Sequence, residues 1–210
     1  MILFLMILQS CAFVSAWALV HRHVKTNGPI SGSRKFTVLN SRFYSAASAA
    51  LLIFIVTSKH EETAQKLYFA SKFYEYIDVL GVRASGGEID LHFAVHHLTT
   101  PYLTYIRAIR YDEGWRIVAA LNAFHHILMY AFFGGAGFCR PALPVTGTAQ
   151  LVAGLIGEAW MIWRKSIDSM GPSWPNGLSL GMLIVYFVLW TRDLRLRAQS
   201  QSQSSQSKSS

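Results

Sequence analysis

Histidines are concentrated in two consecutive apolar stretches of this sequence, which hold five of the eight imidazoles. A titratable side chain at membrane depth is costly, so such groups usually face a bundle interior and tend to be functional. His92 and His96 are four residues apart and share one helical face, while His97 lies about 100° further round. The second stretch repeats this polar face with Asn122, His125, His126, Met129 and Tyr130. The spacing predicts two helices whose imidazoles meet across a buried cavity.

Charged and amide side chains lie in the neighbouring apolar stretches as well. Lys72, Glu75 and Asp78 precede the histidines, and Gln150 and Glu158 follow them. Each group alone has a simpler explanation, because Lys72 and Glu75 can form an ion pair that only fixes helix packing. Two histidine pairs in consecutive helices, each with polar companions, favour a functional site instead.

Buried imidazoles are suited to metal ligation, proton transfer or nucleophilic attack. His92-xxx-His96-His97 is similar to a histidine box of the membrane desaturases and hydroxylases, which hold two irons with about eight ligands. Only five histidines lie in apolar stretches here, and the sequence has no third box, so we predict no metal. A neutral imidazole that is shielded from water can instead attack a thioester.

The composition predicts a membrane protein. Of the 210 residues, 52% are hydrophobic and 14% are charged, and the mean hydropathy is +0.29. The two cysteines, Cys11 and Cys139, exclude a disulfide scaffold. A net charge of +8 would suggest nucleic-acid binding in a soluble protein. In a membrane protein it indicates basic loops at an anionic membrane face or a polyphosphate ligand, and we predict no nucleic-acid partner.

Apolar stretches recur at about the length that a helix needs to cross roughly 30 Å of hydrocarbon. The expected spans are residues 1–20, 37–57, 66–82, 91–109, 116–133, 143–163 and 178–191. Basic or Gly- and Pro-rich turn sequences separate them. The predicted fold class is therefore all-α, a polytopic membrane helical bundle with about seven transmembrane helices.

The first apolar stretch has two interpretations. A cleavable signal peptide fits its apolar run, with Ala16-Trp17-Ala18 as the processing site, but the basic residues follow the run instead of preceding it. We therefore expect an uncleaved anchor with its N-terminus outside. The distribution of Lys and Arg over the loops then places the first loop and the C-terminus in the cytosol.

Residues 1–197 are expected to form a single integral-membrane domain. Residues 198–210, with the sequence AQSQSQSSQSKSS, are low in complexity and too polar to pack. We predict that they form a disordered, Ser- and Gln-rich cytosolic tail.

Three motifs together resemble the ELO family of very-long-chain fatty acid elongases. They are SKFYEYID at 71–78, HFAVHH at 92–97 and NAFHHILMY at 122–130. That family has a lysine, a glutamate and an aspartate at this spacing, a box that ends in a histidine pair, and an Asn-xxx-His-xx-Met-Tyr motif, in this order. The family box usually has two residues before the pair, whereas three residues separate His92 from His96 here.

The resemblance implies a 3-oxoacyl-CoA synthase, an acyltransferase that condenses acyl-CoA with malonyl-CoA and releases CO2 and CoA through a histidine-linked acyl intermediate. His96 is then the predicted nucleophile, and His97 orients or deprotonates it. His126 polarises malonyl-CoA or stabilises its enolate, and Asn122 donates a hydrogen bond to the thioester oxygen. His92 belongs to the same predicted catalytic group.

The resemblance also implies a substrate-binding set and a cellular setting. The predicted substrate-binding residues are Lys72, Glu75, Asp78, His125, Tyr130, Arg83 and Arg140. The two arginines are candidates for the phosphates of CoA at the cytosolic face. We expect no cofactor besides the substrates acyl-CoA and malonyl-CoA. The expected partners are the lipid bilayer and the reductases and dehydratase of the elongation cycle, and a homo-oligomer stays open. The expected location is the endoplasmic reticulum membrane, with several spans and a cytosolic C-terminus.

Two other functions stay open on the sequence alone. One is a di-iron desaturase or hydroxylase built on the histidine box. The other is a seven-span transporter or receptor without catalytic activity, which would not need paired imidazoles at mid-span unless it carried protons.

Overall fold

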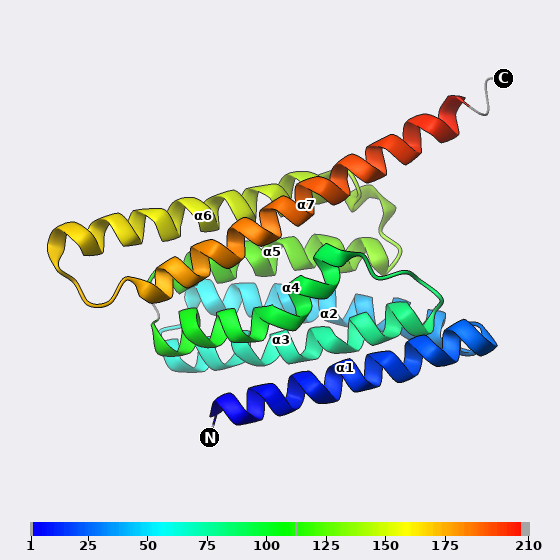
Figure 1. Ribbon diagram of the computed structural model, residues 1–210, viewed down its shortest axis with the longest axis horizontal. Helices are drawn as coiled ribbons and strands as arrows, with labels where there is room; N and C mark the ends of the chain where they lie inside the picture. Colours follow the sequence, from blue (N-terminus) through cyan, green and yellow to red (C-terminus); the bar gives the residue numbers. More distant parts are fainter. Residues whose placement is uncertain (1, 112, 207–210) are drawn as a thin grey trace.

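The computed structural model describes residues 2–111 and 113–206 and confirms the predicted all-α class (Figure 1). The α-helices in these ranges are α1 Ile2–Asn27, α2 Ser33–Thr57, α3 Glu61–Ala84, α4 Leu91–Thr104, α5 Trp115–Phe133, α6 Ala142–Asp168 and α7 Trp174–Gln206. A π-helical segment, η1 Tyr105–Arg110, continues α4, and a short 3-10 helix, η2 Gly137–Cys139, precedes α6.

The end of the chain differs in part from the predicted disordered tail. That tail was expected to begin at residue 198, whereas α7 continues to Gln206. Ala, Gln and Arg favour helix, and a helix that is already formed is extended at little cost. Residues 207–210 of the predicted tail lie outside the described residues.

Five helices are long and apolar enough to cross a membrane, within the part of the chain that the structure describes. They are Phe4–Asn27, Ser33–Thr57, Trp115–Phe133, Ala142–Asp168 and Trp174–Gln199. The other two predicted spans correspond to α3 and α4. The charged residues of α3 lower its hydropathy, and α4 has only 14 residues before the π-helical segment begins. The helices therefore indicate a multi-pass membrane protein. Only five of the seven predicted spans have the length and composition of a membrane-crossing helix.

The contacts between helices arrange α2 to α7 as a closed ring of six helices. α2 packs against α3 and α5, α3 against α4, α4 against α7, α7 against α6, and α6 against α5. α1 lies outside the ring, where it packs mainly on α3 (Figure 1). The ring brings α4 and α7, which are far apart in the sequence, into contact.

The bundle formed by this ring of helices has two ends, which we name after residues that lie there. The Asp90 end holds the connections at 28–32, 85–90 and 134–141, together with the C-terminal half of α7 (right in Figure 1). The Trp115 end holds the connections at 58–60 and 169–173, together with Glu113 and Gly114 before α5 (left in Figure 1).

Helix α4 positions most of the predicted histidines, and its ends have local causes. It begins at Leu91 because Asp90 caps it: Oδ1 of Asp90 accepts a hydrogen bond of 2.7 Å from the backbone N–H of Phe93. Pro101 interrupts the hydrogen bonding inside α4, and the helix then widens into η1. Arg107 of η1 is buried. The predicted span 91–109 thus corresponds to α4 and η1 together.

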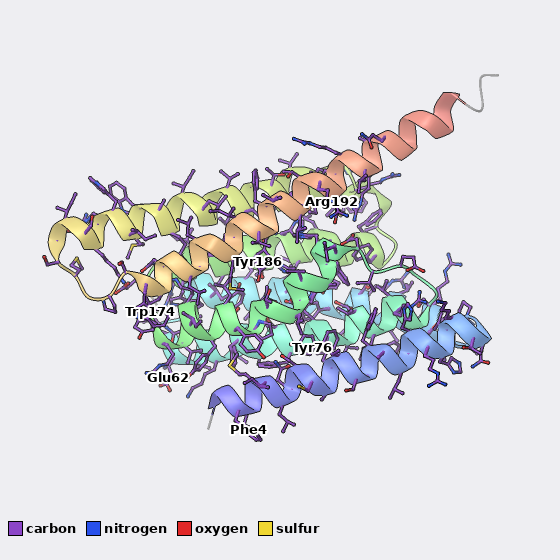
Figure 2. All side chains as sticks on the ribbon, in the orientation of Figure 1. Phe4, Glu62, Tyr76, Trp174, Tyr186 and Arg192 are labelled. Atoms are coloured by element: carbon purple, nitrogen blue, oxygen red, sulfur yellow. The ribbon has the colours of Figure 1, made fainter. Side chains whose placement is uncertain are left out.

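The outer helix α1 is attached by aromatic and hydroxyl contacts. Phe13 stacks on Tyr76 of α3 with ring centroids 4.0 Å apart, and Tyr102 of α4 hydrogen-bonds to the backbone oxygen of Met6 at 2.9 Å. Figure 2 shows Tyr76 pointing towards α1, while Phe4 points away from the bundle. Phe4 is 66% exposed, as expected for a side chain that faces lipid.

Candidate active site

Two cavities lie inside the ring and adjoin at His96. The Trp115-end cavity has a largely apolar wall that includes Leu103, Val118, Ala119, Leu151 and Leu183. The Asp90-end cavity has all five predicted imidazoles in its wall, namely His92, His96, His97, His125 and His126. His96, Gln150 and Leu151 line both cavities. The structure therefore brings the histidines of α4 and α5 together across a buried space, as their spacing predicts.

Glu75 of α3 lies between imidazoles of two other helices and is fully buried. Its Oε1 is 3.4 Å from Nδ1 of His126, and its Oε2 is 3.3 Å from Nδ1 of His97. Lys72 Nζ donates to the same Oε1 at 2.7 Å, and the Tyr44 hydroxyl, which donates to the backbone oxygen of Ser71 at 3.0 Å, lies 3.3 Å from it. A carboxylate in this place favours a proton on Nδ1 of both rings. Nε2 of each ring is then its basic nitrogen.

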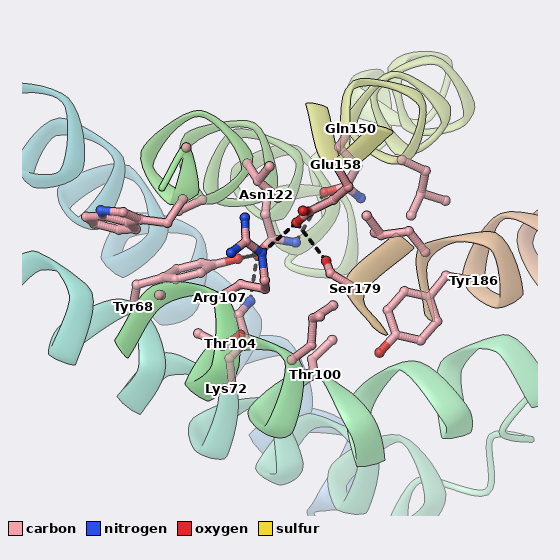
Figure 3. A pocket seen from close by; sticks show the side chains of 18 of the residues that line it. Tyr68, Lys72, Thr100, Thr104, Arg107, Asn122, Gln150, Glu158, Ser179 and Tyr186 are labelled. Atoms are coloured by element: carbon pink, nitrogen blue, oxygen red, sulfur yellow. Dashed lines mark hydrogen bonds and ion pairs between the residues drawn. The ribbon is translucent and has the colours of Figure 1, made fainter. Parts of the chain in front are cut away.

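Lys72 and Asn122 extend this network to α6. Lys72 Nζ also donates to Oδ1 of Asn122 at 2.6 Å, and Nδ2 of Asn122 donates to Oε1 of Gln150 at 3.2 Å. The same Nδ2 is 3.4 Å from Nε2 of His126. Lys72 is only 2% exposed, so its charge depends on the opposite charge of Glu75. Figure 3 shows Lys72, Asn122 and Gln150 in the wall of the Trp115-end cavity.

His96 is held by aromatic packing. The centroid of its ring is 5.0 Å from that of Tyr186, 5.2 Å from that of His97 and 5.6 Å from that of His92. Its Nδ1 is buried without a hydrogen-bond partner among the described residues. His97 contacts His96 through an edge-to-face ring contact only, because Nδ1 of His97 is directed to Glu75. The ring of His96 is therefore oriented by packing, to which His97 contributes an edge-to-face contact.

His125 faces α6, away from Glu75. Its Nδ1 is 2.8 Å from Oγ1 of Thr146. Trp190 of α7 lies beside it, and the indole Nε1 donates to Oγ1 of Thr148 at 3.0 Å. A Cβ atom at Gly147 would lie 2.6 Å from Cζ2 of Trp190, so the glycine makes room for the indole. Sequence reasoning missed Trp190, which is one aromatic residue among many on an apolar helix.

Asp78 and Tyr130 line neither cavity. Oδ1 of Asp78 accepts a hydrogen bond of 2.7 Å from Nδ2 of Asn40 on α2. Tyr130 packs edge-on against Tyr44 and His126, with ring centroids 4.5 Å and 5.4 Å away. Of the predicted charged trio on α3, Lys72 and Glu75 therefore join the histidines, whereas Asp78 bonds to a neighbouring helix.

The two arginines predicted to contact CoA phosphates line neither cavity. Arg83 is buried against its own loop, where Nη1 donates to the backbone oxygen of Gly87 at 3.1 Å, and Arg140 is exposed beyond η2. Arg197 lies in the wall of the Asp90-end cavity instead, with its Nη2 3.0 Å from Oδ2 of Asp90. Only the packing of α7 against α4 brings this arginine to the cavity.

A buried ion pair lies in the wall of the other cavity, at the Trp115 end (Figure 3). Arg107 Nε is 2.8 Å from Oε1 of Glu158. Ser179 Oγ and Asn176 Nδ2 donate to the two oxygens of Glu158, each at 2.7 Å. Two further donors of Arg107 bond to backbone oxygens at 2.6 Å and 3.0 Å. The charges are thus neutralised inside the wall, and the apolar cavity ends against them.

Arg107 was missed as an interior residue, although the sequence contains a signal for it. His96, Thr100, Thr104 and Arg107 follow one another at helical spacing and all line the Trp115-end cavity. Tyr186 was missed as well, because its contact with His96 joins α7 to α4.

The histidines do not converge on a common point. His97 and His126 face Glu75, His125 faces Thr146, and His92 and His96 stack on each other. Among the described residues, no group of three or more His, Cys, Asp or Glu side chains is arranged to hold a metal ion.

The comparison with protein families finds the same family that the three sequence motifs indicate. A model of the ELO family, described as the GNS1/SUR4 family, matches residues 2–195. No curated protein and no solved structure was found to match the chain. The family match confirms the resemblance seen in the three motifs and extends it to nearly the whole sequence. The chain therefore belongs to the ELO (GNS1/SUR4) family, which assigns it broadly to fatty acid elongation.

Proposed function

We propose that the protein is a condensing enzyme that joins acyl-CoA and malonyl-CoA to give 3-oxoacyl-CoA, CO2 and free CoA. The observation that carries this proposal is the position of His96, which lines both an apolar cavity and a histidine-lined cavity. A group that accepts an acyl chain from one thioester and transfers it to another substrate needs access to both. The family membership supports the same reaction class.

In the first step, a ring nitrogen of His96 attacks the carbonyl carbon of the acyl thioester. The carbon–sulfur bond breaks, the imidazole proton goes to the departing thiolate, and free CoA leaves. The acyl group stays on His96 as an acyl-imidazole. Tyr186, His97 and His92 surround the ring and exclude water, which would otherwise hydrolyse this intermediate.

In the second step, malonyl-CoA loses CO2 and its enolate carbon attacks the acyl carbonyl. The carbon–nitrogen bond to His96 breaks, and the ring takes up one proton from solvent, which is the proton that the overall reaction consumes. The product is a 3-oxoacyl-CoA that is two carbons longer than the acyl-CoA. His126 and His97 lie in the wall of the cavity in which this step takes place, and either ring, once protonated beside Glu75, can stabilise the enolate oxygen.

In this mechanism Glu75 is a positioning residue. It contacts Nδ1 of both His97 and His126, so it holds the rings in one orientation and stabilises a positive charge on either of them. Asn122 donates to Gln150 and approaches His126, so its role is to hold His126 rather than to bind the thioester directly. This assignment separates the positioning of the rings from the chemistry at His96.

The two cavities suit different parts of the substrates. The acyl chain would lie in the Trp115-end cavity, where the wall is apolar and ends at Arg107 and Glu158. The CoA portions would enter from the Asp90 end, where Arg197 can exchange Asp90 for a phosphate group. We further propose the endoplasmic reticulum membrane as the location, a cytosolic Asp90 end, and the reductases and dehydratase of the elongation cycle as partners.

The test is detection of the acyl-imidazole. The purified protein is incubated with acyl-CoA alone and digested, and the peptide that contains His96 is analysed by mass spectrometry. We expect an acyl adduct on this peptide and release of free CoA. His96→Ala should remove the adduct and reduce the incorporation of radiolabelled malonyl-CoA by about a hundredfold or more.

His60→Ala is the matched control, because His60 is exposed in the loop before α3. It should keep both the adduct and the turnover. Turnover that survives in His96→Ala, together with an unmodified peptide in the wild type, would show that His96 is not the acyl carrier.

A further inference from the structure

The hydroxyl of Thr146 determines which nitrogen of His125 carries a proton. Thr146 Oγ1 donates its hydrogen to the backbone oxygen of Ala142 at 2.9 Å, with a longer approach of 3.5 Å to that of Leu143. Because a hydroxyl has one hydrogen, an Oγ1 that donates to Ala142 accepts from the ring nitrogen 2.8 Å away. In that arrangement Nδ1 of His125 carries the N–H, and Nε2 of the neutral ring is a hydrogen-bond acceptor.

His125 forms part of the wall of the Asp90-end cavity. Trp190 forms the neighbouring part of the wall, with its ring nearly perpendicular to His125 at a centroid distance of 6.4 Å. Three consecutive residues of α6 hold this pair in place. Thr146 bonds His125, Gly147 leaves space for the indole, and Thr148 accepts from Nε1 of Trp190.

An acceptor next to an apolar indole selects among the groups of a CoA thioester. Carboxylate and phosphate oxygens carry no hydrogen and would be repelled by the lone pair of Nε2. The amide N–H groups of the pantetheine arm are donors, and the methylene groups beside them suit the indole face. We propose that Nε2 of His125 accepts a hydrogen bond from a pantetheine amide and thereby fixes the depth at which the thioester reaches the histidines. This inference rests on the proposed condensing function.

The test compares two thioesters of malonate in the wild type and in His125→Phe. One is malonyl-pantetheine, and the other is malonyl S-pentyl thioester, which has no amide. Phe keeps the ring in the wall but removes the acceptor. We expect the KM for malonyl-pantetheine to rise about three- to tenfold with kcat unchanged, and the kcat/KM for the S-pentyl thioester to stay as in the wild type.

Thr146→Val serves as a second variant, because it leaves the imidazole in place and removes only the group that selects its tautomer. It should raise the KM for malonyl-pantetheine in the same direction by a smaller factor, and again leave the S-pentyl thioester unaffected. His60→Phe, in an exposed loop, is the matched control and should behave as the wild type.

Three results would overturn the inference. An equal loss on both thioesters in His125→Phe would indicate a structural or catalytic role, and an unchanged KM for malonyl-pantetheine would exclude the hydrogen bond. Either result leaves the condensing function intact as long as the wild type elongates acyl-CoA. Absence of elongation by the wild type would instead remove the proposed function and this inference with it.

Discussion

The Trp115-end cavity and the Asp90-end cavity share His96, Gln150 and Leu151, but their other walls differ in chemistry. The first has aliphatic side chains and ends at an ion pair whose partners are all inside the protein. The second has imidazoles, and Asp90 and Arg197 in its wall form a partly exposed pair. A satisfied buried ion pair acts as a fixed wall, whereas an exposed pair can exchange partners.

The difference between the two cavities indicates that they have separate roles on either side of the His96 imidazole. His96 needs no hydrogen bond of its own, because packing orients it and both cavities reach it. His97 and His126 instead share the buried carboxylate of Glu75. If the division is correct, changes in one cavity should alter the handling of one substrate only, and changes between the cavities should affect both.

The largest effect is expected from Glu75→Gln, because Glu75 contacts wall residues of both cavities, Lys72 of the first and His97 and His126 of the second. The substitution leaves the buried charge of Lys72 without a partner and should lower the free energy of unfolding by about 3–5 kcal/mol. It also releases His97 and His126, so kcat should fall by about a hundredfold or more. Thermal unfolding in detergent and incorporation of labelled malonyl-CoA measure the two effects.

The double variant Lys72→Met/Glu75→Gln separates these contributions. Removing both charges should restore much of the stability, since no unpaired charge stays buried. The activity should stay low because the rings are still without their carboxylate. Recovery of activity together with stability would mean that Glu75 serves folding alone.

A smaller and more selective effect is expected from Val118→Phe in the Trp115-end cavity. The larger side chain shortens the space for an acyl chain, so kcat/KM for the longest accepted acyl-CoA should fall by about tenfold or more. Shorter acyl-CoAs and the KM for malonyl-CoA should be unaffected. Ile117→Phe is the control, because Ile117 is 68% exposed on the outer face of the same helix. A uniform loss across all chain lengths would argue against an acyl site here.

The smallest effect is expected from Gly147→Ala in the Asp90-end cavity. The added Cβ would meet the Trp190 indole at 2.6 Å and push it towards the cavity. The KM for malonyl-CoA should rise about three- to tenfold, with overpacking that costs about 1–3 kcal/mol of stability. The acyl-length profile should not change.

Gly157→Ala on the same helix is the matched control for this change. Nothing lies within 4 Å of a Cβ atom at this position, so the substitution should leave KM unchanged and stabilise α6 slightly. A shift in acyl-length preference in Gly147→Ala would mean that the two cavities do not hold separate substrates.

Local patterns in the sequence were sufficient to predict the helices and the helix faces that carry the histidines. The predicted starts of the fourth and fifth spans lie within one residue of the observed helix starts, Leu91 and Trp115, because caps and turn residues are local signals. The common face of His92 and His96 follows from their spacing, and their rings stack in the structure. The roles of Lys72, Glu75 and Asp78 could not be separated in this way, since their partners lie on other helices.

The sequence by itself thus determined the class of the protein, its apolar helices and the inward faces that carry the histidines, because these depend on composition and on a period of 3.6 residues. Only the tertiary structure decided that Glu75 lies between His97 and His126, that Arg107 meets Glu158, and that Trp190 and Arg197 line the second cavity. These contacts join residues of different helices. They depend on the order in which six helices close a ring, which no local pattern encodes.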